Sequence, residues 1–188
     1  MPPSVKITKE RIVDAAMELV RQGGANSLNA RALAELLGCS TQPIFSNFSS
    51  MEELDEAVTV AAHQLYLDFL HREMESGKYP QYKSFGMAYI RFADEEKELF
   101  KLLFMRDRHG EDLTPTADFE SSVEIIMSSC GVTHDIATLI HMEMWACVHG
   151  IGTMLATSFL TLDWELISTM LSDVYLGIRT RHLSTKEE

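Results

Sequence analysis

Residues 38–54 read GCSTQPIFSNFSSMEEL, and this stretch decides the fold of the amino-terminal part of the chain. Ser40 is placed to cap a short helix, whose first three positions would be Thr41, Gln42 and Pro43. The N–H groups of a helix's first turn have no acceptor within the helix, so a proline costs little there. The spacing predicts a buried face made of three apolar residues, Ile44, Phe45 and Phe48.

The outer face of this short helix would be polar and uncharged. It would carry Thr41, Gln42, Ser46 and Asn47, and no Lys or Arg occurs between residues 32 and 71. Hydroxyl and amide groups can read base edges in DNA without carrying charge. The same face is also compatible with ordinary exposure to solvent.

Two further helices precede this one. Thr8 is a suitable N-cap for a helix that runs to Gln22 and stops at Gly23-Gly24. Asn29 would cap a second helix that ends at Gly38 and turns three leucines inward, Leu33, Leu36 and Leu37. Three short helices, the last two separated by Gly-Cys-Ser, have the size and spacing of a helix-turn-helix.

The rest of the chain also predicts helices. Ser50 and Glu53 form a capping box that opens a helix to about Glu75. After the linker 76–81, we expect a helix over 82–107 that bends near Asp94, and a loop over 108–115 in which Pro115 starts the next helix. That helix would end at 130–131, and two long helices would follow, capped by Thr133 and Thr161 and ending near 158 and 181. The tail 183–188 is expected to fray, and the fold class is all-α with about nine helices.

The composition narrows the class of protein. The chain has 188 residues, 46% of them hydrophobic and 23% charged, as in ordinary globular proteins. The longest apolar runs are too short for a membrane span of about 20 residues. Without a hydrophobic signal segment at its start, the chain is expected in the cytoplasm. The three cysteines form no CxxC pair, so reduced thiols are favoured over a redox sensor.

The charge is strongly acidic overall but uneven. A net charge of −12 argues against a nonspecific nucleic-acid binder. Residues 1–31, however, carry five Lys and Arg against three Asp and Glu. The sequence therefore predicts an acidic body with a mildly basic amino-terminal end.

Four spaced segments resemble the DNA-binding domain of the TetR family of transcriptional regulators. They are RIVDAAMELVRQGG, SLNARALAELLGCS, the IFxxF run and S-x-E-E-L, which together fill most of residues 11–54. The resemblance implies that the third helix enters the major groove and that the start of the second contacts phosphates. Carried over by position, it implies DNA contacts by Asn29, Arg31, Thr41, Gln42, Ser46 and Asn47.

Two positions depart from that family's pattern. Phe45 stands where a tyrosine is common, so a hydroxyl that would bind a phosphate is missing. Met51 stands where many members have a lysine, although backbone N–H groups at the helix start can still face a phosphate. We therefore expect a shallow salt dependence of DNA binding.

The carboxy-terminal part resembles a TetR ligand-binding domain. The segments are YIRFADEEKELFKLLF and MWACVHG, and the second carries a Trp-His-Gly signature at Trp145, His149 and Gly150. The resemblance implies a DNA-binding domain over 1–50 and a ligand-binding and dimerisation domain over 51–188. It also implies that a small apolar or amphipathic effector releases a repressor from DNA.

Aromatic residues and methionines are candidates to line the effector pocket, although such residues are more often plain core. They are Tyr66, Phe69, Tyr89, Phe92, Phe100, Phe104, Met105, Met127 and Trp145. For His149 a structural hydrogen bond is favoured over a ligand contact.

The last two long helices are apolar on more than one side, so they need more partners than one chain offers. A four-helix interface between two copies would supply them, and a dimer would match a pseudo-palindromic operator. The predicted interface residues are Ile151, Met154, Leu155, Ile167, Leu171, Val174 and Ile178.

Three other functions fit the sequence less well. An enzyme lacks support, because no catalytic triad order, nucleophile elbow or phosphate loop occurs. A metal site at His141, Glu143 and His149 is disfavoured, since eight helical residues separate the two histidines by about 12 Å. No cofactor is expected. A TetR-like ligand-binding protein with weak or no DNA binding remains open, because the reading face is neutral and the chain is acidic.

Overall fold

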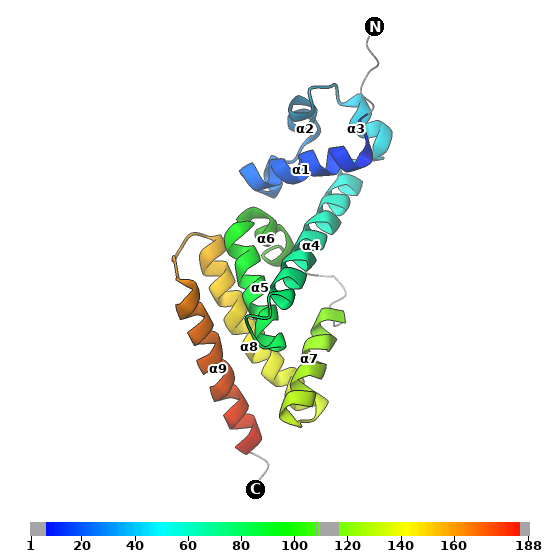
Figure 1. The fold of residues 1–188 in the computed structure, drawn as a ribbon. Helices are drawn as coiled ribbons and strands as arrows, with labels where there is room; N and C mark the ends of the chain where they lie inside the picture. Colours follow the sequence, from blue (N-terminus) through cyan, green and yellow to red (C-terminus); the bar gives the residue numbers. More distant parts are fainter. Residues whose placement is uncertain (1–6, 108, 110–116, 185–188) are drawn as a thin grey trace. The chain divides into compact units, whose positions relative to one another are not determined.

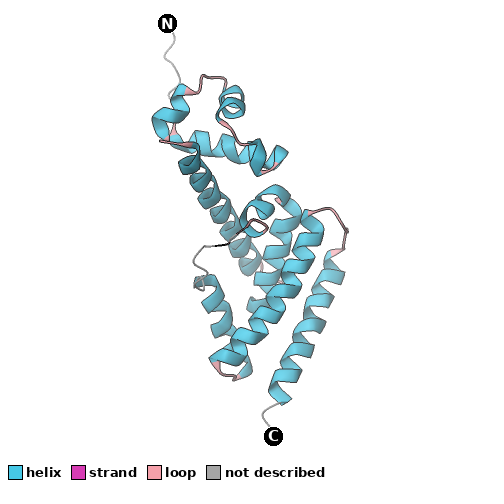
Figure 2. Cartoon of the chain, turned by 180° about the vertical axis from the view of Figure 1, so that it is seen from behind, coloured by secondary structure: helices cyan, strands magenta, loops and turns pink. Residues whose placement is uncertain are grey.

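The computed structural model describes residues 7–107, 109 and 117–184, and everything it describes is helix or connecting loop (Figure 2). The described part contains nine α-helices and one 3-10 turn, which confirms the all-α class. The bounds of the α-helices are α1 Lys9–Gly23, α2 Ala30–Leu37, α3 Gln42–Asn47, α4 Met51–Glu75, α5 Gln81–Glu95, α6 Lys97–Phe104, α7 Ala117–Cys130, α8 His134–Ala156 and α9 Trp164–Ser184.

The chain divides into two compact units. The amino-terminal unit comprises 1–67 and 96–106, and the carboxy-terminal unit comprises 68–95 and 107–188. The division therefore runs through α4 and falls at the break between α5 and α6. The functional boundary at residue 50 stays a prediction.

The ends of the first two helices form as predicted. The side chain of Thr8 accepts a hydrogen bond from the N–H of Arg11 at 3.3 Å, and Gly24 ends α1 with φ 74°. The side chain of Asn29 accepts from the N–H groups of Arg31 and Ala32 at 3.2 and 3.0 Å. Gly38 ends α2 in the left-handed region with φ 66°, a conformation that glycine adopts at low cost.

The predicted cap of α3 is wrong by one residue. The helix begins at Gln42, and Thr41 rather than Ser40 holds the cap position. Thr41 makes no side-chain cap bond, and its carbonyl accepts from the N–H groups of Ile44 and Phe45 at 3.1 and 3.3 Å. Pro43 is thus the second helical residue, still within the turn that needs no N–H donor.

Two apolar residues predicted to be buried are exposed. Phe45 is 49% exposed and Leu36 is 47% exposed, whereas Ile44, Phe48 and Leu33 are almost fully buried. Ile44 lies inside α3 and Phe48 is the extended residue that ends it, whereas Phe45 follows Ile44 and points about 100° away from it. A helix of six residues buries one narrow face, and two large side chains already fill it.

The capping box at α4 is confirmed with a shifted partner. The hydroxyl of Ser50 accepts from the N–H of Glu53 at 3.3 Å. The carboxylate of Glu53 accepts from the N–H and the hydroxyl of Ser49, both at 2.7 Å, instead of reaching the N–H of Ser50. The helix ends at Glu75 as expected.

The remaining boundaries agree with the sequence except at α9. The α5–α6 break falls at Glu96, two residues beyond the predicted bend, and α7 ends at Cys130 before Gly131 with φ 64°. Thr161 does not cap the last helix, because Asp163 accepts from the N–H of Leu166 at 2.8 Å. The predicted helix start at Pro115 and the tail residues 185–188 lie outside the described residues.

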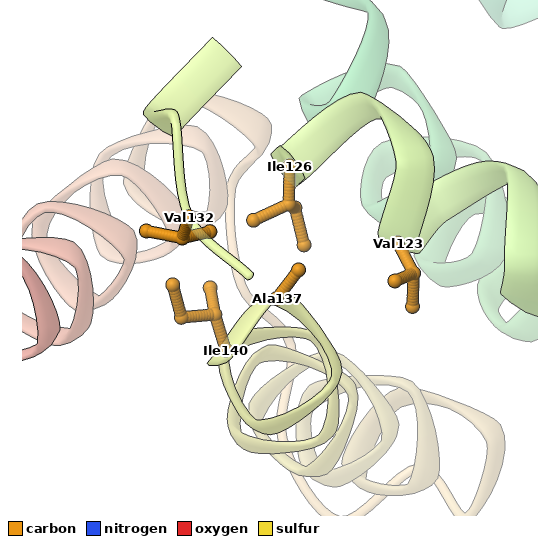
Figure 3. Packing of buried hydrophobic residues seen from close by; sticks show 5 residues of the cluster. All are labelled: Val123, Ile126, Val132, Ala137 and Ile140. Carbon is orange, nitrogen blue, oxygen red and sulfur yellow. The ribbon is translucent and has the colours of Figure 1, made fainter. Parts of the chain in front are cut away.

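Within the carboxy-terminal unit, α8 packs against α5, α7 and α9, and Figure 1 shows α8 and α9 side by side. One buried cluster joins α7 to α8, and Figure 3 shows four of its side chains converging. Those four are Ile126, Val132, Ala137 and Ile140, with Val123 completing the cluster.

Among the described residues, no single helix has the length and apolarity of a membrane span. One pair, Phe119–Cys130 and His134–Ala156, meets those criteria together but is bent by 114°.

Candidate nucleic-acid interface

The turn between α2 and α3 is built by backbone hydrogen bonds. The N–H of Gly38 donates to Glu35 at 3.1 Å, and the N–H of Cys39 donates to Ala34 at 2.9 Å. These bonds satisfy carbonyls at the end of α2 and turn the chain sharply. The turn fixes how α3 is presented relative to α2.

The outer face of α3 combines polar and apolar side chains. Gln42 and Ser46 are exposed as predicted, and Phe45 lies exposed with them. Ser46 donates to the carbonyl of Gln42 at 2.9 Å. Among the described residues, the amide of Gln42 makes no hydrogen bond, so it is available to a base edge. Thr41 is half-buried at the start of the helix.

Two of the predicted contact residues are held by the protein itself. Asn47 donates from its amide to the carbonyls of Pro43 at 2.8 Å and Ile7 at 3.4 Å, and so joins α3 to the segment before α1. Asn29 caps α2 and also donates to the carbonyl of Ser27 at 3.1 Å. Both side chains organise the motif, whatever they contribute to binding.

The positive charge of this unit is partly neutralised. Lys9 pairs with Glu53 at 3.0 Å, and Arg21 pairs with Glu96 through bonds of 2.8 and 3.1 Å. Arg11 and Arg31 are exposed and form no ion pair with any described residue. Of these two, Arg31 lies in the first turn of α2 and was predicted to contact a phosphate.

The start of α4 already holds carboxylates. Hydrogen bonds from the N–H and hydroxyl of Ser49, together with Lys9, lower the pKa of Glu53 to about 2. A hydrogen bond from Ser50 and its own backbone N–H lower the pKa of Glu52. These two negative charges compete with a phosphate for the amino-terminal end of the helix. The expected backbone contact at Met51 is therefore disfavoured.

The predicted pocket residues fall in both units. In the amino-terminal unit, Phe104 contacts the rings of Tyr66 and Phe100, with both centroid distances at 5.3 Å. Phe100 is fully buried, as a plain core residue would be, whereas Met105 is 40% exposed.

In the carboxy-terminal unit, Phe69 and Phe92 are buried and meet edge to face at 5.3 Å. Met127 packs against the cluster that joins α7 to α8. The hydroxyl of Tyr89 is hydrogen-bonded to Nδ1 of His149 at 2.8 Å, which confirms the predicted hydrogen bond of this histidine. Trp145 stacks on the same ring at 5.0 Å, with an interplanar angle of 10°.

The predicted dimer residues are already largely covered within one chain. Ile151, Leu155, Ile167 and Leu171 are buried, with exposures between 0% and 4%, and Met154, Val174 and Ile178 are half-buried. The single chain thus supplies partners for this stripe. Other apolar residues of the two helices stay exposed: Leu139, Met142, Trp145, Leu166 and Leu176.

The histidines considered as metal ligands have other partners. Nδ1 of His141 is hydrogen-bonded to the hydroxyl of Tyr82 at 3.0 Å, and Glu143 pairs with His182 at 3.0 Å. Among the described residues, no three His, Cys, Asp or Glu side chains come together as a metal site.

Two family models match the chain in succession. The model described as "Bacterial regulatory proteins, tetR family" matches residues 12–58. The model described as "Tetracyclin repressor-like, C-terminal domain" matches residues 82–171. The first covers most of α1, all of α2 and α3, and the start of α4. The second covers nearly all of α5, all of α6, α7 and α8, and the start of α9.

Individual proteins resemble the chain over most of its length. The HTH-type transcriptional regulator Rv0681 of Mycobacterium tuberculosis is 25% identical over 189 residues, which cover 96% of this chain and 86% of the relative. The HTH-type transcriptional regulator YvkB of Bacillus subtilis is 26% identical over 106 residues, or 56% of each protein. A solved TetR family transcriptional regulator from Vibrio parahaemolyticus has the same fold, with a TM-score of 0.62 at 14% identity, over 89% of this chain and 96% of that one.

Proposed function

Because the chain belongs to the TetR family of helix-turn-helix transcriptional regulators, we propose that it is a ligand-responsive repressor acting as a dimer on a pseudo-palindromic operator. It would act in the cytoplasm, and a small apolar or amphipathic molecule would release it from DNA. The observation that carries the proposal is the exposed face of α3, where a free amide, a hydroxyl and an aromatic ring lie together.

Each of these side chains has a chemical counterpart in the major groove. The amide of Gln42 can bond to N6 and N7 of adenine, and Ser46 can donate to or accept from any base. The exposed ring of Phe45 is suited to the methyl group of thymine. Arg31 would bind a phosphate and fix the register without reading sequence. The unexpected exposure of Phe45 thus gives the face an apolar contact in place of the missing hydroxyl.

The dimer is supported by two glycines on exposed helix faces. Gly150 in α8 and Gly177 in α9 lie inside helices, where glycine is about 1 kcal/mol less favourable than alanine. A Cβ added at either position would meet nothing within 4 Å in the single chain. Trp145, Leu166 and Leu176 are exposed on the same two helices. A second copy approaching closely would use the glycines and cover the apolar side chains.

The effector would be held in the carboxy-terminal unit beside Phe69, Tyr89 and Phe92. The Trp-His-Gly subgroup assignment rests on Trp145, His149 and Gly150 and stays a prediction. The single helix α4 passes from one compact unit into the other, so a bound molecule that tilts it would move the DNA-reading helices. Coupling of this kind is reciprocal, so operator DNA must weaken effector binding by the same factor.

A second candidate is a ligand-binding protein with weak or no DNA binding. The carboxylates of Glu52 and Glu53 at the start of α4 favour it, because they lie where a phosphate contact was expected.

Fluorescence anisotropy against duplexes tiled from the DNA flanking its own gene separates the two candidates. We expect the protein to bind one pseudo-palindromic duplex tightly. Gln42→Ala should lower the affinity for that duplex by roughly 5- to 150-fold, equivalent to about 1–3 kcal/mol. Gln22→Ala, an exposed glutamine of α1, is the control. If no tile is preferred over scrambled DNA, the repressor proposal fails and the second candidate stands.

The salt dependence of the same titration tests the charge distribution. With a neutral reading helix and carboxylates at α4, few phosphates are neutralised, and each adds only about −0.9 to the log–log slope. We expect a shallow slope. One as steep as that of a strongly basic repressor would contradict the proposed contact set.

Light scattering of Gly150→Leu and Gly177→Leu tests the interface. The Cβ of either leucine meets nothing within 4 Å in the single chain, so we expect the variants to fold. We expect their dimers to be weaker, so that they dissociate at a higher protein concentration than the wild-type dimer. A monomeric wild type at micromolar concentration would refute the dimer.

A further inference from the structure

A group of reactive side chains lies where the end of α7 packs against α9. Sγ of Cys130 is 3.4 Å from the hydroxyl of Tyr175 and 3.7 Å from the hydroxyl of Ser129. Arg179 lies close enough to the sulfur to lower the pKa of the Cys130 thiol. Tyr175 and Arg179 are four residues apart in α9, so both approach the thiol from one face of that helix. Two hydroxyl groups thus lie within 3.7 Å of one sulfur atom, with a cation nearby.

Arg179 has no carboxylate partner among the residues that the structure describes. Its Nε–H is buried and makes no hydrogen bond there, although an arginine normally offers its N–H groups as a fork to two acceptor atoms. The cation is therefore not neutralised by an acidic side chain among the described residues, and its Nε–H lacks an acceptor there.

The surroundings of Cys130 differ from those of Cys147. Partial burial raises the pKa of the Cys130 thiol, but hydrogen bonds from Tyr175, Ser129 and Arg179 outweigh it, and the pKa is lowered overall. Burial alone raises the pKa of Cys147. Tyr175 remains a donor, because burial and its bond to Cys130 raise the pKa of its hydroxyl. Around the group, Tyr82 of α5 packs on the ring of Tyr175 at 5.6 Å and is hydrogen-bonded to His141 of α8.

We propose that Cys130 is a thiol modification site that reacts with peroxides, with Arg179 and Tyr175 stabilising its thiolate. The thiolate sulfur attacks one oxygen of hydrogen peroxide, an S–O bond forms and the O–O bond breaks. Hydroxide leaves with the electron pair and takes a proton from solvent to become water. Sulfur is oxidised by two electrons to sulfenic acid, and the peroxide is reduced by two.

The unpaired N–H of Arg179 gives the oxidised form a stabilising contact. We expect an oxygen bonded to Sγ to supply the acceptor that this N–H lacks. Cys130 is half-buried, so a molecule as small as hydrogen peroxide can reach it. Because the thiol joins α7 to Tyr175 of α9, oxidation changes a contact between two helices of the carboxy-terminal unit. Oxidation of Cys130 by a peroxide does not depend on operator binding.

The test follows all three cysteines of the full-length protein at once. Iodoacetamide labelling over a range of pH, read by peptide mass spectrometry, gives an apparent pKa for Cys39, Cys130 and Cys147. A tenfold larger thiolate fraction is offset about threefold by the lower nucleophilicity of a more acidic thiol. We expect the apparent pKa of Cys130 to be lower than that of Cys147. We also expect Cys130 to react at least about threefold faster than Cys147 at neutral pH. After peroxide treatment, dimedone should label Cys130 first.

Variants separate the charge of Arg179 from its packing. Arg179→Gln should raise the apparent pKa of Cys130 and slow its labelling by about threefold or more, while Arg179→Lys keeps the charge and should restore part of the rate. Arg181→Gln on the same helix is the control. If Arg179→Gln does not fold, the lysine variant and Tyr175→Phe carry the comparison. Equal rates for Cys130 and Cys147, or a profile unchanged by the Arg179 variants, would overturn the proposal.

Discussion

The two compact units use their polar side chains in different ways. Around α1–α4, the hydrogen bonds that shape the fold are local: Thr8 caps α1, Asn29 caps α2 and Ser50 caps α4, each bonding within three residues. In the carboxy-terminal unit, polar groups join helices that are distant in sequence. Tyr82 bonds to His141 across 59 residues and Lys83 to Ser168 across 85.

This difference shows what holds each unit together. Two long-range polar contacts of the amino-terminal unit, Lys9–Glu53 and Arg21–Glu96, are ion pairs near the surface, which typically contribute about 0–1 kcal/mol. The bond from Asn47 to the carbonyl of Ile7 is a long contact of 3.4 Å. The tertiary structure of this unit therefore depends mainly on its buried apolar side chains. The carboxy-terminal unit adds part-buried hydrogen bonds between helices, which cost more to break because the freed groups lose access to water.

The largest expected effect comes from the core of the amino-terminal unit. Phe48→Ala removes a side chain that is 1% exposed, and we expect a loss of about 3–5 kcal/mol in the free energy of unfolding. Phe45→Ala, three residues earlier and 49% exposed, is the matched control. It should change stability by less than about 0.5 kcal/mol and weaken operator binding instead.

Denaturant unfolding of both variants measures their stability. Fluorescence anisotropy with the duplex that the wild type binds measures their affinity for the operator. Equal stability losses for the two phenylalanines would mean that α3 packs differently from the structure.

The next effect tests the bonds between α5 and α9. Lys83 donates from Nζ to the carbonyl and hydroxyl of Ser168 and to the hydroxyl of Ser172, at 2.7 to 2.8 Å. Lys83→Met keeps most of the volume and removes all three bonds, so we expect a loss of about 1–3 kcal/mol. Lys78→Met is the control, because Lys78 also lies over the ring of Tyr79 at 5.1 Å but is exposed.

Thermal or denaturant unfolding compares the two lysines under identical conditions. If Lys78→Met destabilises as much as Lys83→Met, the ring contact matters and the bonds to α9 do not.

The same contrast explains what the sequence could predict. Helix caps and C-terminal glycines act on residues within about four positions. The ends of α1, α2 and α4 could therefore be located from the local sequence alone. The errors at α3 and α9 arose where neighbouring residues compete for one cap. Thr41 follows Ser40, and Asp163 follows Thr161 by two residues, so tertiary packing decides which one lies at the helix end.

The sequence predicted which types of residue occur at the candidate site, but not which of their side chains are exposed and which are buried. The polar residues of α3 were identified, but the exposure of Phe45 depends on Ile44 and Phe48 filling the core where α3 packs against α1. The bonds of Tyr82 and Tyr89 to histidines 59 and 60 residues away leave no local pattern. The predicted dimer residues stay a prediction, although four of them are already buried within the single chain.

A smaller effect distinguishes the observed cap of α9 from the predicted one. Asp163→Ala removes the acceptor for the N–H of Leu166, and we expect a loss of about 1 kcal/mol. Thr161→Ala, at the position the sequence favoured, should leave the unfolding free energy within about 0.5 kcal/mol of the wild type. Equal losses for both would indicate that the α8–α9 connection is capped by more than one residue.

The smallest effect is a pH dependence confined to the carboxy-terminal unit. Burial lowers the pKa of His141 and of His149 below the ordinary 6.5. Since the folded pKa values are the depressed ones, the stabilisation is complete above about pH 6.5 and is lost as the pH falls from 6.5 through the folded values. Both rings are partly accessible to solvent, so we expect a modest decrease in the thermal midpoint.

The double variant His141→Gln/His149→Gln should flatten this dependence, because glutamine keeps a hydrogen-bonding group near Tyr82 and Tyr89 and does not titrate. His71→Gln, an exposed histidine of α4, should leave the wild-type slope unchanged. A slope that persists in the double variant would place the titrating groups elsewhere. It would also weaken the contrast between the units, since these two rings are the titrating members of the hydrogen bonds that join α5 to α8.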